Sequence, residues 1–276
     1  MSAATTRRVL VTGGTGAIGG AVVERLRAEG AELAFSGRNL TRGTELAGRT
    51  GATFVPGDVR ESGAVSAIVA EALGVLGGLD GLVLATGVLH RSPLSETTDA
   101  AWDALIETNV VAPVLFARAC LDALSDGGGA IVAIASGVAD WPEAELGAYS
   151  VSKRALLWMT RMLAVEGASR GVRANAVCPG HTAVGMSSVV NGADPLERPP
   201  PVPPSGGHAT AAEAAEGVGL PPPTQGLPPT GRCATAAEVA EAVAYLLSDA
   251  AAGSTGAALS VDGGMLAALS AARVRQ

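Results

Sequence analysis

The feature that most constrains the fold is a short apolar strand that runs directly into a glycine-rich loop. Residues 9–12 read Val-Leu-Val-Thr, residues 13–20 read Gly-Gly-Thr-Gly-Ala-Ile-Gly-Gly, and a helical pattern follows. Gly14, Gly16 and Gly19 match the spacing G-x-G-x-x-G, in which glycines let the backbone approach a pyrophosphate at a helix N-terminus. Glycine-rich turns are common, but the order strand, glycine loop, helix is the context that a dinucleotide-binding fold requires.

Apolar segments alternate with helical patterns along the whole chain, which predicts a doubly wound Rossmann fold of the α/β class. We expect about seven parallel strands with helices on both faces of the sheet. Apolar residues make up 48% of the sequence but aromatic residues only 3%, so the core is expected to consist of Ala, Val, Leu and Ile. The predicted strands are 9–12, 32–36, 53–55, 82–85, 130–135, 173–177 and 257–261, and the long predicted helices are 61–76, 100–124, 147–170 and 236–247.

We expect a single domain over residues 1–276, with one insert of different composition at 187–230. The insert holds eleven of the sixteen prolines and no aromatic residue, so it can neither extend the sheet nor build a core. Two interpretations remain open. The insert is either a lid over the substrate end of a cleft or a passive, disordered loop.

The composition excludes several classes of partner. The net charge of -7 and the absence of an arginine-rich run argue against a surface for nucleic acid or for an anionic membrane. No apolar run approaches the ~20 residues that cross a bilayer, which favours a cytoplasmic protein. Cys120, Cys178 and Cys233 are widely spaced and odd in number, so they are expected to be buried free thiols rather than disulfides or metal ligands. The expected partner is a small molecule.

The strongest candidate for chemistry is the pair Tyr149 and Lys153. In a helix, this spacing places the phenol and the ammonium on one face, about one turn apart. A nearby positive charge favours the phenolate and lowers the pKa of a phenol from ~10, which would make the pair a tuned acid and base. The pattern also arises by chance on helix surfaces. However, Lys153 is the only lysine in the chain and Tyr149 is one of two tyrosines.

Three further polar residues stand where a ligand would be expected. Ser136 follows the predicted strand 130–135, and ligands of parallel sheets bind beyond the C-terminal ends of the strands. Asn109 lies inside a predicted helix. Asn is a mediocre helix former, so its presence there suggests a polar group turned toward a site. Each also has an ordinary interpretation, Ser136 as a turn residue and Asn109 as an exposed side chain. After the second strand, Gly37 stands where an acid would bind the ribose hydroxyls, and Arg38 follows it.

These motifs in this order resemble the short-chain dehydrogenase/reductase family, in particular its single-domain, 3-oxoacyl-reductase-like members. The resemblance rests on TGGTGAIG, Asp58, Asn109, Ser136, YSVSK, the sequence Cys-Pro-Gly at 178–180 and a C-terminal stretch that ends in Val-Asp-Gly-Gly at 261–264. It covers nearly the whole chain. It implies reversible hydride transfer between a nicotinamide cofactor and a carbonyl compound, for example a 3-oxoacyl or polyketide-like substrate.

The resemblance also implies roles for individual residues. Tyr149 would donate the proton, Ser136 would polarise the carbonyl, Lys153 would lower the pKa of Tyr149 and hold the nicotinamide ribose, and Asn109 would position a water next to Lys153. Asp58 and Val59 would contact the adenine, and Pro179, Gly180 and Thr182 would line the nicotinamide end. The full set of implied cofactor-binding residues is Gly13, Thr15, Gly16, Ala17, Ile18, Gly19, Arg38, Asp58, Val59, Ala85, Gly87, Tyr149, Lys153, Pro179, Gly180 and Thr182.

The sequence departs from the family pattern at four places. Ala17 replaces a glycine of the phosphate loop, residues 84–87 read Leu-Ala-Thr-Gly rather than Asn-Asn-Ala-Gly, Val184 replaces a threonine, and the stretch before Arg232 is long. These changes affect the expected cofactor affinity and substrate, not the four catalytic candidates. Two other functions stay open: a redox-inactive nucleotide-binding or scaffold protein, and a dehydratase or epimerase that uses the cofactor.

Two expectations concern the cofactor and the assembly. A guanidinium at Arg38 can form charge-assisted, bidentate bonds to a 2'-phosphate, and Arg42 could add a second charge, so NADP(H) is expected to be preferred over NAD(H). The predicted helices 100–124 and 147–170 carry apolar residues on more faces than one sheet can cover. They therefore predict a homo-oligomer, a tetramer or a dimer.

Overall fold

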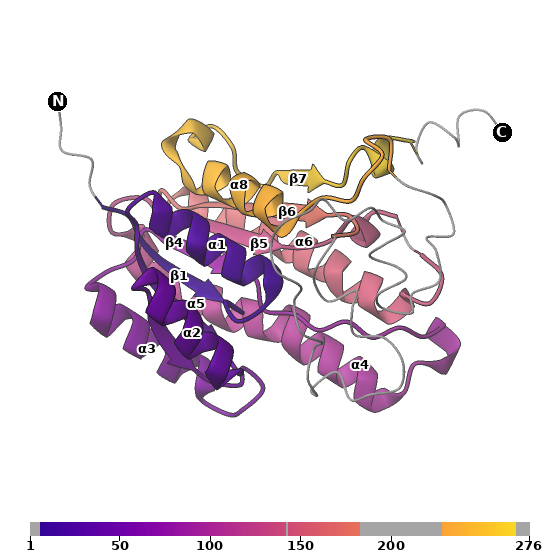
Figure 1. The fold of residues 1–276 in the computed structure, drawn as a ribbon, viewed down its shortest axis with the longest axis horizontal. Helices are drawn as coiled ribbons and strands as arrows, with labels where there is room; N and C mark the ends of the chain where they lie inside the picture. Colours follow the sequence, from indigo (N-terminus) through magenta and orange to yellow (C-terminus); the bar gives the residue numbers. More distant parts are fainter. Residues whose placement is uncertain (1–5, 142, 183–227, 269–276) are drawn as a thin grey trace.

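The computed structural model describes residues 6–141, 143–182 and 228–268 (Figure 1). As predicted, its strands form one seven-stranded, all-parallel sheet, and the strand order is β3-β2-β1-β4-β5-β6-β7. The order reverses between β1 and β4, which places a crevice at the C-terminal ends of these strands. The strands are β1 Arg8–Thr12, β2 Glu32–Gly37, β3 Thr53–Pro56, β4 Gly81–Leu84, β5 Ala130–Ile134, β6 Arg173–Pro179 and β7 Ala258–Val261.

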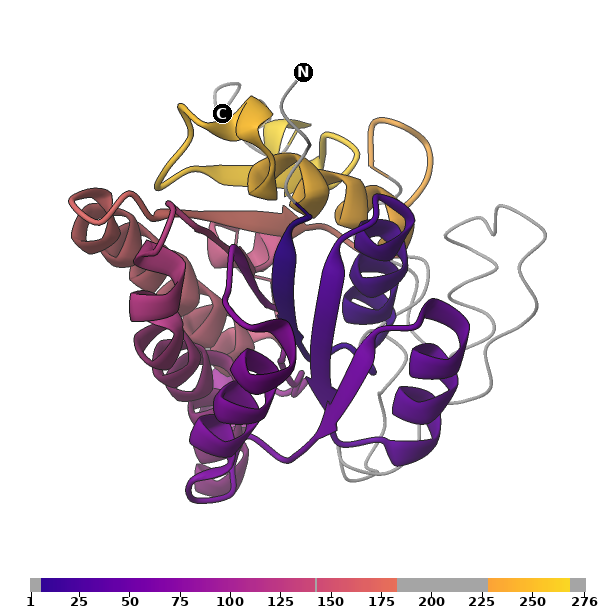
Figure 2. The same cartoon turned by 90° about the vertical axis from the view of Figure 1, so that its left-hand side faces the viewer.

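Helices cover both faces of this sheet (Figure 2). One face packs against α1 Ala17–Ala28, α2 Leu40–Thr50 and α8 Ala236–Leu247. The other packs against α3 Ala64–Leu76, α5 Ala112–Ser125 and α6 Gly147–Ala168. The central strands β4 and β5 are buried along their whole length, as expected for parallel strands covered on both sides. Short helical turns complete the described chain: η1 Leu94–Glu96, η3 Gly137–Ala139 and η5 Asp249–Ala251.

Helix α2 was not among the predicted helices. Local signals for it exist in the sequence, because the Asn39 side chain caps its first turn by accepting from the Arg42 N–H and Gly51 ends it in a left-handed conformation. Its apolar side is carried by few residues, among which Leu46 is buried. The small number of apolar residues, rather than a missing cap, explains why the helix was overlooked.

The predicted helix 100–124 is interrupted in the structure. It consists of α4 Asp99–Ile106, a π-helical turn η2 at Glu107–Val111, and α5. By length and composition Asp99–Ser125 could cross a membrane, which corrects the expectation that no stretch approaches that length. A core helix meets the same criterion, and here Phe116, Cys120 and Leu124 are fully buried against the sheet. Packing in the core therefore accounts for part of the apolar character of this segment.

Two further expectations can be compared with the structure. Cys120 and Cys178 are buried free thiols as predicted, whereas Cys233 is only half-buried. Cys233 lies just before α8, outside the two sheet-facing layers.

Most of the predicted insert at 187–230 lies outside the described residues. Its described end contacts the loop after β7, where the Thr230 N–H donates to the Gly263 carbonyl at 3.1 Å.

Candidate active site

The glycine loop joins β1 to α1 so tightly that glycine is required. A Cβ atom on Gly19 would lie 2.2 Å from the Gly13 carbonyl oxygen, and one on Gly13 would lie 2.7 Å from the backbone of Ala85. No side chain caps the N-terminus of α1, and its first turn contains no acidic residue. Free N–H groups at the positive end of a helix suit an anionic phosphate group. The loop thus fits the pyrophosphate of a dinucleotide, and Ala17 at the first helical position does not obstruct it.

The ends of β2 and β3 lie next to this loop. Gly37 faces Thr15 so closely that a Cβ atom on Gly37 would lie 2.3 Å from Thr15 Oγ1. Arg38 and Asp58, distant in sequence, form an ion pair with 3.5 Å between Nη1 and Oδ2. Asp58 also accepts two hydrogen bonds from the Arg60 guanidinium, the main reason why its pKa lies below the usual range. The cluster presents two arginines and one carboxylate where the adenosine half of a cofactor is expected.

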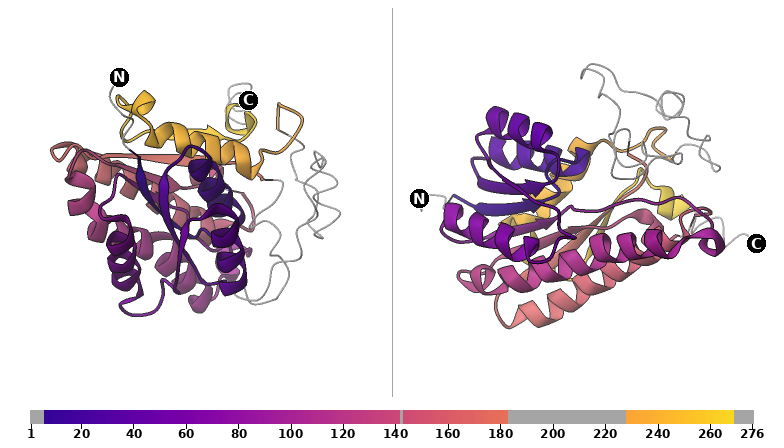
Figure 3. Two further views of the ribbon diagram at one scale, coloured as in Figure 1. Left: turned by 60° about the vertical axis from the view of Figure 1, so that its left-hand side comes forward. Right: turned by 90° about the horizontal axis from the view of Figure 1, so that it is seen from below.

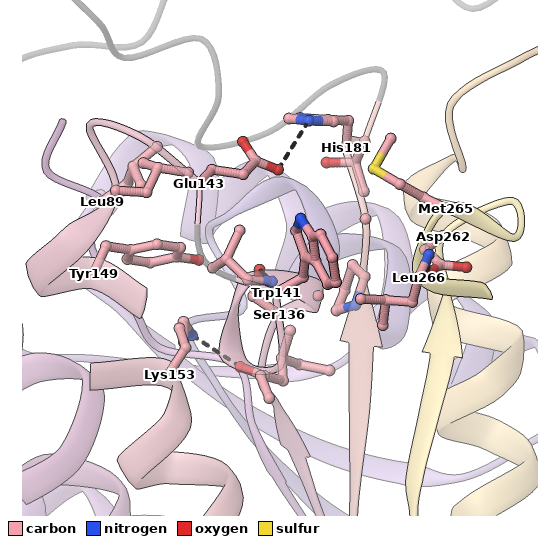
Figure 4. Close-up of a pocket in the computed structure, with 18 of the residues that line it drawn as sticks. Leu89, Ser136, Trp141, Glu143, Tyr149, Lys153, His181, Asp262, Met265 and Leu266 are labelled. Atoms are coloured by element: carbon pink, nitrogen blue, oxygen red, sulfur yellow. Dashed lines mark hydrogen bonds and ion pairs between the residues drawn. The ribbon is translucent and has the colours of Figure 1, made fainter. Parts of the chain in front are cut away.

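Ser136, Tyr149 and Lys153 meet in one cavity of about 130 Å³ at the C-terminal ends of β5 and β6 (Figure 4). Ser136 follows β5, and its side chain is near enough to that of Tyr149 on α6 to lower the pKa of the phenol. Lys153 lies one turn further along α6 and donates from Nζ to the Ile134 carbonyl at 2.9 Å. Eight of the predicted site residues line this cavity: Ile18, Ala85, Ser136, Tyr149, Lys153, Pro179, Gly180 and Thr182.

The electrostatics of the pair differ from the prediction. Burial raises the pKa of Tyr149 to about 12, and the nearby Ser136 side chain offsets only part of that rise. Burial also lowers the pKa of Lys153 to about 8, because the charged ammonium loses water. The Lys153 Nζ lies 5.8 Å from the Tyr149 ring centroid and bonds a backbone carbonyl instead of the phenol. Burial and Ser136, not Lys153, therefore set the pKa of Tyr149.

Asn109 does not line the cavity but anchors two of its walls. Its amide oxygen accepts from the Val88 N–H at 2.8 Å, and its amide nitrogen donates to the Val88 carbonyl at 2.9 Å and to Ser152 Oγ at 3.0 Å. The side chain is completely buried, which excludes the ordinary interpretation of an exposed Asn. It ties the segment after β4 to the helix that carries Tyr149. The π-helical turn around it frees backbone carbonyls from regular α-helical bonding.

The remaining predicted residues lie off this cavity. Val59 packs against the core, so an adenine contact would use its exposed part only. The others belong to the loop and strand ends described above: Gly13, Thr15, Gly16, Ala17, Gly19, Arg38, Asp58 and Gly87. Within the described ranges, no group of three or more His, Cys, Asp or Glu residues is placed to hold a metal ion.

Sequence reasoning missed the outer part of the cavity. Trp141 and Glu143 come from the loop before α6, His181 follows β6, and Met265 and Leu266 follow β7 (Figure 4). Glu143 Oε1 and His181 Nε2 approach to 3.5 Å above Tyr149 and Ser136. These residues lie in loops without a periodic pattern. The position of His181, directly after the Pro179-Gly180 pair that ends a strand, is the one signal that could have indicated it.

Comparisons with known proteins agree with this geometry. The family model described as "short chain dehydrogenase" matches residues 7–194, and the model described as "Enoyl-(Acyl carrier protein) reductase" matches residues 204–266. The chain belongs to the short-chain dehydrogenase/reductase family. The resemblance inferred from the motifs is therefore confirmed.

Individual relatives extend over most of the chain. The 2-(S)-hydroxypropyl-CoM dehydrogenase 3 of Xanthobacter autotrophicus is 32% identical over 94% of this chain and 96% of that protein. A 3beta-hydroxysteroid dehydrogenase of Mediterraneibacter gnavus is 36% identical over 63% of this chain and 65% of that protein. The crystal structure of a dehydrogenase/reductase from Sinorhizobium meliloti superimposes with a TM-score of 0.77 at 32% identity, covering 96% of both chains. Members of this family use a nicotinamide cofactor and act on small molecules.

Proposed function

We propose that this chain is an NADP(H)-dependent oxidoreductase that interconverts a ketone or aldehyde and the corresponding alcohol. The observation that carries the proposal is the convergence of Ser136, Tyr149 and Lys153 in one cavity bounded by the residues after β6. The names of the two relatives above refer to a hydroxypropyl and a hydroxysteroid compound. Both names are consistent with a carbonyl and alcohol pair as the reacting group.

The side chains are suited to carbonyl reduction. The bound cofactor supplies the hydride. The Ser136 hydroxyl is placed to donate to the carbonyl oxygen, which becomes more basic as the hydride arrives. Tyr149 holds its proton firmly at neutral pH because its pKa is raised, so the phenol is present in the acid form that reduction consumes. Lys153, with a lowered pKa, can receive or release a proton near neutral pH and can hold a ribose hydroxyl.

The preference for NADP(H) is proposed from the cluster at the ends of β2 and β3. The Arg38 side chain is 41% exposed, and in the described ranges its one ion pair is the 3.5 Å contact with Asp58, so its guanidinium can turn to a 2'-phosphate. Asp58 keeps its stronger contact with Arg60 when Arg38 leaves, since that contact includes a hydrogen bond of 2.8 Å. Gly37 has no side chain, so it places no carboxylate near a ribose. An acidic residue at this position is disfavoured, because its Cβ atom would collide with the Thr15 side chain. These features support the phosphorylated cofactor.

The proposal is tested by following cofactor absorbance while a panel of ketones and aldehydes is offered with NADPH or NADH. The wild type should be more efficient with NADPH, and Arg38→Ala should lose about ten- to a hundredfold of that preference, the usual range for one charge-assisted contact. The matched control is Arg49→Ala, which removes an exposed arginine paired with Glu24. Equal efficiency with the two cofactors in the wild type would refute the assignment of NADP(H).

We also propose that the protein is a homo-oligomer. Several large apolar side chains on α4, the π-helical turn, α5 and α6 are exposed, and the two helical segments lie side by side on one face (Figure 3). Val165 is 73% exposed and Trp158 is 58% exposed, although both lie on the same helix as Tyr149. Exposed apolar patches of this kind are typical of interfaces between subunits. The exposed residues are Trp102, Val111, Val114, Val151, Trp158, Met162 and Val165.

A further inference from the structure

Arg91 is a charged residue in the wall of the cavity for which the proposed reaction has no role. It lies in the segment after β4 and lines the same cavity as Ser136 and Tyr149. The next residue, Ser92, donates from its N–H to the Glu145 carbonyl at 2.8 Å and pairs with Leu146, immediately before α6. Arg91 is therefore fixed beside the start of the helix that carries Tyr149.

The guanidinium of Arg91 is poorly satisfied. Its side chain is only 19% exposed, and its Nε is buried and has no hydrogen-bond partner within the described part of the chain. Among the described residues its one ion pair is to Glu145, at 4.0 Å from Nη1 to Oε2, the outer limit for such a contact. Burial of a charged donor without an acceptor is costly, so this arrangement favours any ligand that brings oxygen atoms to the guanidinium.

Neither of the neighbouring acids supplies those oxygen atoms. Glu143 is paired with His181 across the cavity, and that contact, with a smaller contribution from Arg91, lowers its pKa. Glu145 is 59% exposed and adopts a positive φ of 63°, a conformation that is costly for a residue other than glycine. The Glu145 carboxylate therefore stays 4.0 Å from the Arg91 guanidinium and is largely exposed to solvent.

Apart from Glu143, His181 and Thr182, the outer cavity is largely apolar. The apolar residues that line it together with Arg91 include Leu89, Trp141, Leu146, Met265 and Leu266. Other charged groups of the cavity are engaged: Lys153 bonds the Ile134 carbonyl, and Asp262 accepts from the N–H groups of Gly264 and Leu266. A ligand that fits must therefore combine an apolar body with one acceptor group for Arg91.

We propose that the substrate is an oxo acid, a carbonyl compound with an apolar body and a carboxylate that Arg91 binds. The inference rests on the proposed carbonyl reductase function and names the substrate class for it. A planar guanidinium can bind both oxygens of a carboxylate, and such a ligand would replace the long contact between Nη1 and Glu145. Arg91 would thus select substrates by a group remote from the reacting carbonyl.

The test compares para-acetylbenzoate with its methyl ester, two ketones that differ in charge and share the aromatic body. We expect wild-type kcat/KM to be at least about tenfold higher for the acid. In Arg91→Met this preference should disappear, mainly through a higher KM for the acid. Arg91→Lys keeps the positive charge but not the planar guanidinium that binds both carboxylate oxygens, so this variant should lose part of the preference for the acid. The control Arg170→Met removes an arginine paired with exposed Asp122, and should keep the wild-type ratio.

Equal rates for acid and ester in the wild type would overturn the inference, and so would an unchanged ratio in the Arg91 variants. If Arg91→Met does not fold, Arg91→Lys tests the inference instead, because its ratio of kcat/KM for the acid to kcat/KM for the ester must fall below that of the wild type. Binding is measured separately from turnover by the shift in melting temperature with para-acetylbenzoate, which should occur in the wild type and not in Arg91→Met. Such binding without oxidation of NADPH or NADH would refute the reductase function and leave the Arg91 site in place.

Discussion

Lys153 is a charged side chain that is almost completely buried, and the free energy cost of burying it depends on pH. Burial lowers its pKa from 10.5 in the unfolded chain to about 8. Between these values the unfolded chain binds more protons than the folded protein, so the stability of the folded protein should rise with pH through this window. Below about 8 both states are protonated and the full cost of burying the charge is present.

This argument predicts how Lys153→Met compares with the wild type. Near neutral pH the variant should be the more stable, because it has no buried charge, and the difference should shrink as pH rises from about 8 to 10.5. Urea denaturation of both proteins across this range measures it. Folding raises the pKa of Tyr149 from 10.0 to about 12, so the titration of Tyr149 affects stability mainly above pH 10.0. Both proteins contain Tyr149, so this effect cancels when their stabilities are compared. A difference that does not change with pH would contradict the burial argument.

Tyr149 and Ser136 lead to a second prediction for single residues. Tyr149→Phe removes the hydroxyl that Ser136 contacts but keeps the ring packed in place, so turnover should fall by about a hundredfold or more while cofactor still binds. Steady-state kinetics and a fluorescence titration with NADPH measure the two effects. Near-wild-type turnover would mean that another group donates the proton.

At the scale of elements, the loop between β1 and α1 has little room for change, because the atoms that an added Cβ would meet belong to the backbone. Gly19→Ala would place a Cβ atom against the Gly13 carbonyl, where only a shift of the backbone can relieve the contact. We expect Gly19→Ala to weaken dinucleotide binding and to lower the melting temperature. The matched control is Gly74→Ala on α3, where a Cβ atom meets nothing within 4 Å. That change should stabilise the protein by up to about 1 kcal/mol, since Ala is the better helix former.

The elements also show what the sequence can and cannot predict. The strands, and Gly19, Ser136 and Tyr149 as candidate site residues, could be picked out because strand periods and short motifs are local properties of the sequence. The two hydrogen bonds between the Asn109 side chain and the Val88 backbone, and the ion pair of Arg38 with Asp58, are different. They depend on which chain segments become neighbours in the folded protein. The high pKa of Tyr149 was missed for a related reason. Spacing along a helix indicates proximity to Lys153, but it does not reveal how completely α6 is covered.

For the whole molecule, the exposed apolar face over α4, α5 and α6 predicts association. Light scattering at micromolar concentration should give the mass of a dimer or tetramer. Because Val165 and Trp158 are exposed and do not line the cavity, Val165→Glu and Trp158→Glu should dissociate the assembly without unfolding the protomer. The control Tyr245→Glu changes an exposed residue of α8, on the other face of the sheet. A monomeric wild type would contradict the prediction.

The central claim is that Ser136, Tyr149 and Lys153 support net hydride transfer, and an isotope experiment tests it most directly. Reduced cofactor that carries deuterium at the hydride-donating carbon is incubated with an accepted ketone, and the alcohol is analysed by mass spectrometry. The account predicts one deuterium per molecule of alcohol, bound to the former carbonyl carbon, with one cofactor oxidised for each alcohol formed. An epimerase or dehydratase would return the hydride to its cofactor. Conversion of the compound without net cofactor oxidation would contradict the account.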